Sequence, residues 1–181
     1  MLRTLSLMAL VVAAICAGGA FTPASAEEWR DIDCANSKIG GPSGLKCRQY
    51  GPYHSGGCQT TVSNRYGEIE GRRVLGRLRQ SSNCHSLAES MPEFAESLKT
   101  LFGKALEGAT WDAPRLFQQQ YVLTGQHKNR ACVAFRIYGP AQGRGHQYHL
   151  SGYNCKPEGQ ITAYTDDEIR EALAMFSRQS V

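Results

Sequence analysis

The chain has 181 residues, of which 41% are hydrophobic and 20% are charged, and its 20 basic residues exceed its 16 acidic ones. This length suits one domain that buries a core of its own. The absence of internal repeats and low-complexity segments excludes a repeat array. Much of the basic excess lies between Arg65 and Arg79, where five arginines stand against Glu68 and Glu70. Such a patch either meets an anionic partner or is an ordinary solvated face.

Residues 1–26 have the pattern of a secretory signal peptide. A basic start precedes an apolar run from Leu5 to Ala20, and Ala24-Ser25-Ala26 is a small-residue cleavage site. The run of about 16 residues is shorter than the ~20 that a spanning helix needs. The alternatives are a retained anchor and a lipoprotein modified at Cys16, and the bulky Ile15 before Cys16 disfavours the second. We expect a periplasmic or secreted protein with no stable membrane span after cleavage, and a single domain over residues 27–181.

Six cysteines remain in this domain, and an exported chain meets oxidising conditions. We therefore predict three disulfide bonds, which would leave no free thiol for nucleophilic catalysis. Export also disfavours nucleic acid as the partner of the basic patch, as does the scarcity of aromatic residues among its arginines. The cysteines concerned are Cys34, Cys47, Cys58, Cys84, Cys132 and Cys155.

The first part of the domain predicts little regular structure. Asp31–Gln59 is rich in glycine, has no apolar periodicity and holds three cysteines, so we expect a loop region that disulfides make rigid. A short strand is plausible at Gln59–Ser63. Glu68–Arg79 is ambiguous, because its apolar spacing suits a helix while Gly71 and Gly76 weaken one.

The second part is clearer. A capping box at Ser90 and Glu93 begins a helix predicted over Met91–Leu106, and a second box at Thr165 and Glu168 begins another. Both are followed by apolar residues at helical spacing, which predicts a core-facing stripe on each. In the second helix the stripe consists of Ile169, Ala172, Leu173 and Phe176.

Three strands are predicted between the helices: Leu116–Thr124, Arg130–Tyr138 and His146–Cys155. If Tyr138 faces His149 across the last two, then Phe135 covers Gly152, a favourable arrangement for a strand glycine. The same register places Cys132 opposite Cys155, within disulfide range, and predicts that bond. The other four cysteines allow three pairings, of which we favour Cys34–Cys47 and Cys58–Cys84. The expected fold is α+β: an antiparallel sheet, with a meander in its C-terminal half, packed with two helices and a disulfide-linked N-terminal loop region.

Candidate binding residues lie in three places. Arg144 stands between two glycines in the loop Gly139–Gly145, where its guanidinium is presented to carboxylate or phosphate groups. Tyr53 and His54 form an aromatic surface in the N-terminal loop region. Arg72 and Arg73 belong to the basic patch. The structural alternatives are a flexible hairpin loop, packing of the aromatic rings onto the sheet, and a solvated face.

Signals for catalysis are weak. His146 and His149 are three residues apart, so on a strand they point to opposite faces, which is poor geometry for two ligands of one metal; on a turn they could converge, together with His54 or His127. Asn83-Cys84-His85 lacks the first cysteine of a haem-attachment motif. Gly41-Pro42-Ser43-Gly44 lacks the glycine spacing of a serine nucleophile elbow. We therefore predict no catalytic residue, no metal and no cofactor.

The pattern Cys132-x-x-Phe135, a glycine loop, Leu150-x-Gly152-Tyr153-x-Cys155 and a terminal helix to Phe176 resembles small secreted alphaproteobacterial proteins of unknown function. The resemblance implies export and a similar hairpin, and it implies no activity. The functional hypothesis is an exported, non-enzymatic binding or accessory protein acting on another protein or an envelope component, with an anionic component as one candidate. The alternatives are a small hydrolase or metal-dependent enzyme built around His146 or His149, and a secreted enzyme inhibitor.

Overall fold

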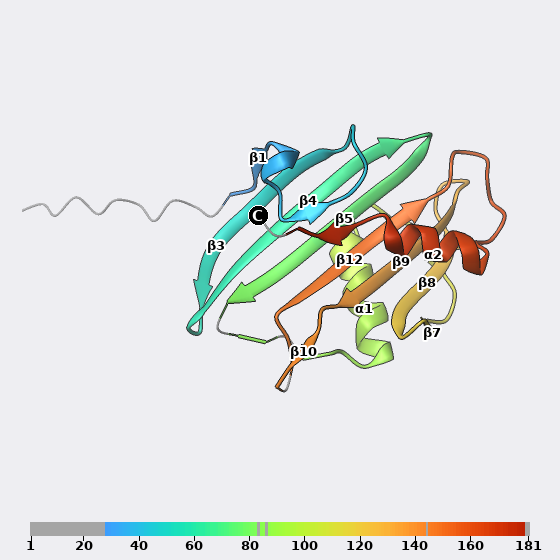
Figure 1. Ribbon diagram of the computed structural model, residues 1–181. Coiled ribbons are helices and arrows are strands. Elements are labelled where there is room, and N and C mark those ends of the chain that lie inside the picture. Colours follow the sequence, from blue (N-terminus) through green and yellow to red (C-terminus); the bar gives the residue numbers. More distant parts are fainter. Residues whose placement is uncertain (1–27, 83, 86, 144, 180–181) are drawn as a thin grey trace, which may run out of the picture.

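A computed structural model describes residues 28–179 except 83, 86 and 144. Its centre is a nine-stranded antiparallel sheet in the order β1-β3-β4-β5-β12-β9-β8-β6, with β7 paired to β8 (Figure 1). The α+β prediction is therefore confirmed. The strands of this sheet are β1 (Arg30–Ile32), β3 (Lys46–Ser55), β4 (Cys58–Ile69), β5 (Arg72–Ser82), β6 (Thr110–Trp111), β7 (Arg115–Phe117), β8 (Gln120–Gln126), β9 (Ala131–Tyr138) and β12 (Tyr148–Cys155).

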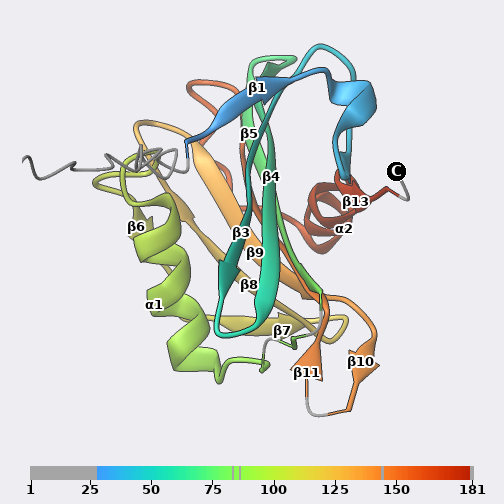
Figure 2. The same cartoon turned by 90° about the vertical axis from the view of Figure 1, so that its left-hand side faces the viewer.

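The two helices cover opposite faces of the sheet, which lies edge-on between them in Figure 2. Helix α1 (Met91–Phe102) buries Phe94, Leu98 and Phe102 against Leu123 and other residues of one face. Helix α2 (Asp166–Ala174) buries Ile169 and Ala172 on the other face. Both capping boxes are formed as predicted. The described helices include none long and apolar enough to cross a membrane.

The predicted register of the C-terminal hairpin is confirmed. Strand β12 pairs with β9 so that Gly152 faces Phe135 and Cys155 faces Cys132. A Cβ added at Gly152 would lie 2.4 Å from Phe135 Cζ, so the ring occupies the space that the glycine leaves. All three favoured disulfide bonds are present: Cys34–Cys47, Cys58–Cys84 and Cys132–Cys155.

The N-terminal region is disulfide-linked as predicted, but the loop region expected over Asp31–Gln59 ends at Leu45, and its prediction is wrong for residues 46–59. Strand β3 occupies ten of these residues and pairs along β4, which runs well past the short strand expected at Gln59–Ser63. Gly56 and Gly57 have positive φ angles and form the tight turn between the two strands. The sequence shows no apolar alternation here because both faces of the β3–β4 hairpin carry polar side chains. The hairpin is held in the sheet by the pairing of β3 with β1 and of β4 with β5.

The ambiguous segment Glu68–Arg79 lies in strands, not in a helix. Its last eight residues belong to β5, where Val74 and Leu78 are buried on one face of the sheet. Gly76 lies between them, and a Cβ there would be 2.6 Å from Phe176 Cγ. The glycine that weakens a helix therefore makes room for an aromatic ring on the strand.

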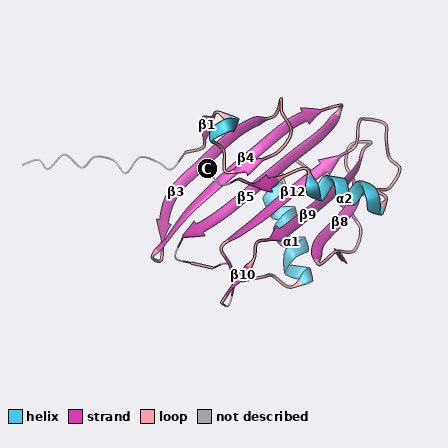
Figure 3. Cartoon of the chain, viewed as in Figure 1, coloured by secondary structure: helices cyan, strands magenta, loops and turns pink. Residues whose placement is uncertain are grey.

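Two further boundaries differ from the predictions. The strand expected over Leu116–Thr124 is the hairpin β7–β8, because Gln118 and Gln119 both adopt positive φ angles in its turn. The first helix ends at Phe102 and not at Leu106, although Leu106 is buried with it. Two short strand pairs lie beside the main sheet (Figure 3). Strand β2 (Ile39–Gly40) pairs with β13 (Ser177–Arg178), and β10 (Ala141–Gln142) pairs with β11 (Gly145–His146). The element η1 (Cys34–Asn36) is a single 3-10 turn.

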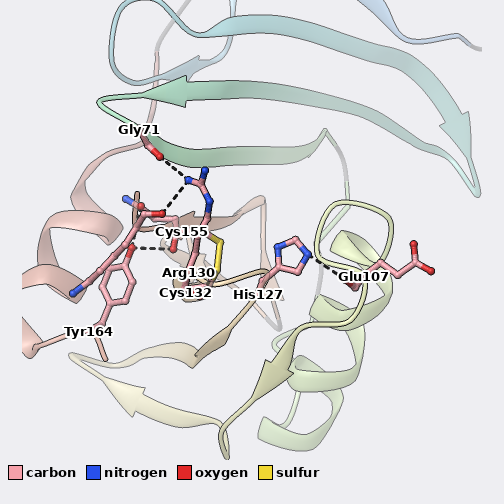
Figure 4. The surroundings of a disulfide bond; sticks show 9 residues. Gly71, Glu107, His127, Arg130, Cys132, Cys155 and Tyr164 are labelled. Carbon is pink, nitrogen blue, oxygen red and sulfur yellow. Dashed lines mark hydrogen bonds between the residues drawn. A yellow bond between two sulfur atoms is a disulfide. The ribbon is translucent and has the colours of Figure 1, made fainter. Parts of the chain in front are cut away.

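Backbone carbonyls near the Cys132–Cys155 bond are tied down by long side chains (Figure 4). The Arg130 guanidinium donates to Gly71 O at 2.6 Å and to Lys156 O at 3.1 Å, which links the β4–β5 turn to the end of β12. His127 pairs through Nε2 with Glu107 O at 3.1 Å. These contacts are internal, and they fix the end of the sheet that lies away from the site described next.

Candidate functional site

A cleft of about 1020 Å³ lies between α1 and the strands β4, β5, β9 and β12. Its floor is the sheet face that α1 covers only in part, and its wall is α1 with the segment before it. Floor and wall each contribute charged and apolar groups, the apolar ones including Val62, Leu87 and Leu101. Leu87 is 69% exposed, the most exposed large hydrophobic residue among those described.

Two adjacent cross-strand rows of side chains cross the cleft floor and extend beyond it, and their members that line the cleft are Val62, Arg77, Arg79, Arg136 and His149. In the first row, the strand register places Arg48 opposite Asn64, Asn64 opposite Arg77, Arg77 opposite Ser151 and Ser151 opposite Arg136. We call these five residues the arginine row. The next row along the strands, on the same face, consists of Tyr50, Val62, Arg79, His149 and Tyr138. Residues two apart on a strand share a face, which is why Arg77 and Arg79 both reach this floor.

Arg136 is the buried end of the arginine row, with only 4% of its surface exposed. Its Nε donates to Ser151 Oγ at 2.9 Å, and its Nη1 donates to Ser97 Oγ at 3.0 Å and forms an ion pair with Glu89. The backbone N–H of Glu89 donates to Tyr138 Oη at 3.1 Å. This network compensates a buried charge and ties the start of α1 to the cleft floor.

Arg77 and Arg79 differ from Arg136, because no described carboxylate forms an ion pair with either of them. Arg77 donates through Nε to Asn64 Oδ1 at 3.0 Å, and its guanidinium lies 5.3 Å from the centre of the Trp29 ring. Burial and the nearby Arg48 guanidinium lower the pKa of Arg77. Arg79 is exposed. The floor therefore holds positive charge that the described residues leave uncompensated.

The cleft wall is acidic, but its carboxylates already have partners. Glu93 Oε2 accepts hydrogen bonds from Ser90 N and Oγ at 2.8 and 2.7 Å, and these bonds lower its pKa. Glu96 lies 3.8 Å from Lys99 Nζ. Glu89 is paired with Arg136 and Glu96 lies near Lys99, so Glu93 is the wall carboxylate with no described cationic partner, against Arg77 and Arg79 on the floor.

His149 lies partly buried on the floor, between Arg79 and Tyr138 in the second row. Burial lowers its pKa to about 3, with further lowering by the charges of Arg136, Arg79 and Arg77 and by His146. The imidazole is therefore neutral at physiological pH and presents one N–H donor and one acceptor. It adds hydrogen-bonding capacity to the floor without adding charge.

The structure does not gather all the predicted binding residues in one place. Tyr53 lines the cleft, whereas His54, the next residue on β3, is exposed and belongs to the opposite face. Arg72 and Arg73 lie at the start of β5, opposite Ile69 and Glu68, roughly 25 Å along the strand from the Tyr53 end. Arg144 lies outside the described residues.

The other histidine singled out by the sequence, His146, pairs through Nδ1 with Gly139 O at 2.6 Å. Its ring packs 4.9 Å from that of Tyr138, centre to centre. Across residues 28–179, leaving out 83, 86 and 144, no three His, Cys, Asp or Glu side chains are grouped so that they could hold a metal ion.

Sequence reasoning missed Arg77, Arg79 and Arg136 as floor residues. Arg77 and Arg79 were visible only as members of a basic patch, because the segment was not recognised as a strand. On a strand, the odd-numbered Arg73, Arg77 and Arg79 share one face and Arg72 takes the other. That alternation was the available signal.

Neither a family model, nor a curated protein, nor a solved structure matches the chain. The resemblance of Cys132–Phe176 to small secreted proteins therefore stays a prediction.

Proposed function

We propose that the chain is an exported binding or accessory protein that holds an anionic group of its partner in the cleft between α1 and the sheet. One observation carries the proposal: Arg77 and Arg79 lie side by side on the cleft floor and no described carboxylate pairs with them. Arginine binds carboxylate and phosphate groups through paired N–H donors. The neutral His149 beside them offers a further hydrogen bond.

The disulfide bonds support the exported setting of this proposal. Three disulfides are typical of chains that fold outside the reducing cytoplasm. The predicted signal peptide, residues 1–26, lies outside the described residues. A periplasmic or secreted location puts the cleft in contact with envelope polymers and exported proteins, the partner class expected from the sequence.

The enzymatic alternative has less support. A pKa of about 3 leaves His149 unprotonated at neutral pH, so it cannot act as a general acid, and it is a weak base. His146 has one ring nitrogen engaged by Gly139 O. The cleft geometry favours binding of charge over proton transfer.

The test is a titration with citrate, a small anion that carries several carboxylates, followed by two-dimensional NMR of the arginine Nε–H signals. We expect citrate to shift the signals of Arg77 and Arg79, and we expect the affinity to fall as salt is added. Arg79→Gln should weaken citrate binding about tenfold, equivalent to the loss of one charge-assisted contact. Arg170→Gln, which removes an exposed arginine from α2 on the opposite face, is the matched control.

Equal citrate affinity of Arg79→Gln and the native chain would contradict the proposal. Shifts confined to arginines away from the cleft would do the same. Glucose, which is uncharged, should cause no shift in either protein.

A further inference from the structure

We infer that the partner is an acidic glycan, a sugar polymer with recurring carboxylates, which lies across the strands from the cleft along the arginine row to Trp29. This inference rests on the proposed anion-binding function of the cleft and extends it to a larger surface. The surface is the α1-side face of β3, β4 and β5, which α1 covers only in part, at Leu75 of β5.

The spacing of the row favours a long ligand over a single small anion. Neighbouring strands lie about 4.8 Å apart, so Arg48 and Arg77 are separated by roughly 9.6 Å at the backbone, as are Arg77 and Arg136. Arg136 is already neutralised by Glu89. The free charges are those of Arg77 and Arg79 in or beside the cleft and of Arg48 two strands further on. This separation is comparable with the length of a disaccharide, so alternate sugars of a longer chain, and not the two sugars of a disaccharide, would place their carboxylates at Arg77 and Arg48.

The surface also has unused hydrogen-bond donors. Arg48 Nε and Asn64 Nδ2 are buried and have no hydrogen-bond partner among the described residues. They lie on directly opposed residues of β3 and β4. An unpaired buried donor is unfavourable, and both of these groups can only donate. Because both atoms are buried, a carboxylated sugar would bring its acceptor oxygens to them only after the neighbouring side chains, Trp29 among them, move aside.

Aromatic rings line the same route. The Trp29 and Tyr50 ring centres are 5.6 Å apart, and those of Tyr50 and Tyr53 are 5.4 Å apart. Tyr53 also lines the cleft, so the three rings connect it with the far end of the arginine row. Tyr and Trp offer an apolar face together with a polar group, which suits the apolar face and hydroxyl rim of a sugar ring. An acidic peptide would use the arginines but has no need of this ring series.

The row also carries repulsion that an anionic ligand would relieve. Arg48 lies 4.6 Å from the Trp29 ring centre and 4.9 Å from that of Tyr66, and Arg77 approaches the same Trp29 ring. The two guanidinium groups thus share one aromatic ring, and burial, together with the charge of Arg48, lowers the pKa of Arg77. A carboxylate near both groups would offset the repulsion between them.

The experiment compares oligogalacturonates of two lengths by isothermal titration calorimetry on the full exported domain. Hexagalacturonate should bind more tightly than digalacturonate, because only the longer chain reaches Arg48. Arg48→Gln should weaken hexagalacturonate binding about tenfold, the effect of losing one charge-assisted contact, and leave digalacturonate binding unchanged. Arg170→Gln should change neither affinity.

A second measurement covers the case in which Arg48→Gln does not fold. Trp29 and Trp111 are the two tryptophans of the chain, and each gives its own indole N–H signal in NMR. Hexagalacturonate should shift the Trp29 signal of the native protein and leave Trp111 unshifted, since Trp111 lies on β6, the edge strand at the opposite end of the strand order from β1. Digalacturonate, which meets Arg77 beside Trp29 but does not reach Arg48, should shift the Trp29 signal less and leave Trp111 unshifted.

The outcomes separate this inference from the proposed function. Equal affinity for both lengths, or a hexaglutamate peptide binding more tightly than hexagalacturonate, would overturn the glycan inference and leave anion binding in the cleft intact. A neutral chitohexaose binding as tightly as hexagalacturonate would also overturn it. If neither the oligogalacturonates, the peptide nor citrate binds, both proposals fall.

Discussion

His149 should make the fold less stable as the medium becomes acidic, and His149→Gln should remove that part of the pH dependence. The ordinary histidine pKa of 6.5 applies to the unfolded chain, whereas the pKa in the folded protein is about 3. The folded pKa is the lower one, so between these values the unfolded chain binds the extra proton. Stability contributed by the neutral ring is therefore present above pH 6.5 and declines as the pH falls towards 3.

The magnitude follows from these two values. At pH 7.5 the unfolded histidine is almost entirely neutral, and at pH 5.5 it is about nine-tenths protonated. The native protein should therefore lose about 1.4 kcal/mol of unfolding free energy between these conditions through His149 alone. The physical cause is first the burial of the ring and then the repulsion that a protonated ring would feel from Arg136, Arg79 and Arg77.

Urea denaturation followed by circular dichroism at pH 7.5, 6.5 and 5.5 measures this difference. His149→Gln keeps a side chain that can donate and accept hydrogen bonds, and the other four histidines are present in both proteins. His54→Gln, at an exposed position, is the control and should retain the native pH slope. If the native protein and His149→Gln lose the same unfolding free energy between pH 7.5 and 5.5, the explanation by burial and arginine charge is refuted.

Three further substitutions test how the fold is held together. Gly152→Ala should cost about 1–3 kcal/mol in urea denaturation, because the new Cβ would lie 2.4 Å from Phe135 Cζ; an unchanged midpoint would mean that the ring moves aside freely. Thr165→Ala removes the N-cap of α2 and should cost about 1 kcal/mol by the same assay, whereas Thr165→Ser should restore the loss. Replacing Cys132 and Cys155 together by alanine should cost about 3 kcal/mol, seen as a lower midpoint of thermal unfolding, and a midpoint equal to that of the native protein would contradict the bond's structural role.

The C-terminal half could be predicted from sequence because each of its features has a local cause. The capping boxes at Ser90 and Thr165 each depend on residues three positions apart. The register of β9 and β12 follows from the need to cover Gly152 with Phe135. Once that register is set, the bond between Cys132 and Cys155 follows from geometry.

The N-terminal half could not be predicted because its strands have polar residues on both faces. Strand β4 alternates without an apolar signature, and it buries Asn64 and Arg65, on opposite faces, as completely as many apolar residues. Gly51, Gly56 and Gly57 are typical of a loop, yet all three lie within or between long strands. Hydrogen bonding to partners distant in the sequence decides this region, and sequence periodicity does not report such pairing.

The candidate site depends on these long-range pairings even more strongly. Arg136 and Glu89 are 47 residues apart in sequence, and their ion pair places the start of α1 beside the cleft floor. Arg48, Arg77 and Arg136 become a row only because β3, β4, β5, β12 and β9 are in register. No local pattern in the sequence connects these arginines.

The distribution of charge over the sheet supports the proposal that the arginine row binds a partner. Where α1 covers the sheet, the one buried arginine, Arg136, is matched by Glu89 and by two serine hydroxyls. Where the face is open, Arg48, Arg77 and Arg79 face no described ion-pair partner, although like charges placed near one another on a sheet are destabilising. A face needed only for solubility would be served equally well by charges of both signs. Concentrated positive charge beside aromatic rings is instead the arrangement that attracts and holds an anionic partner.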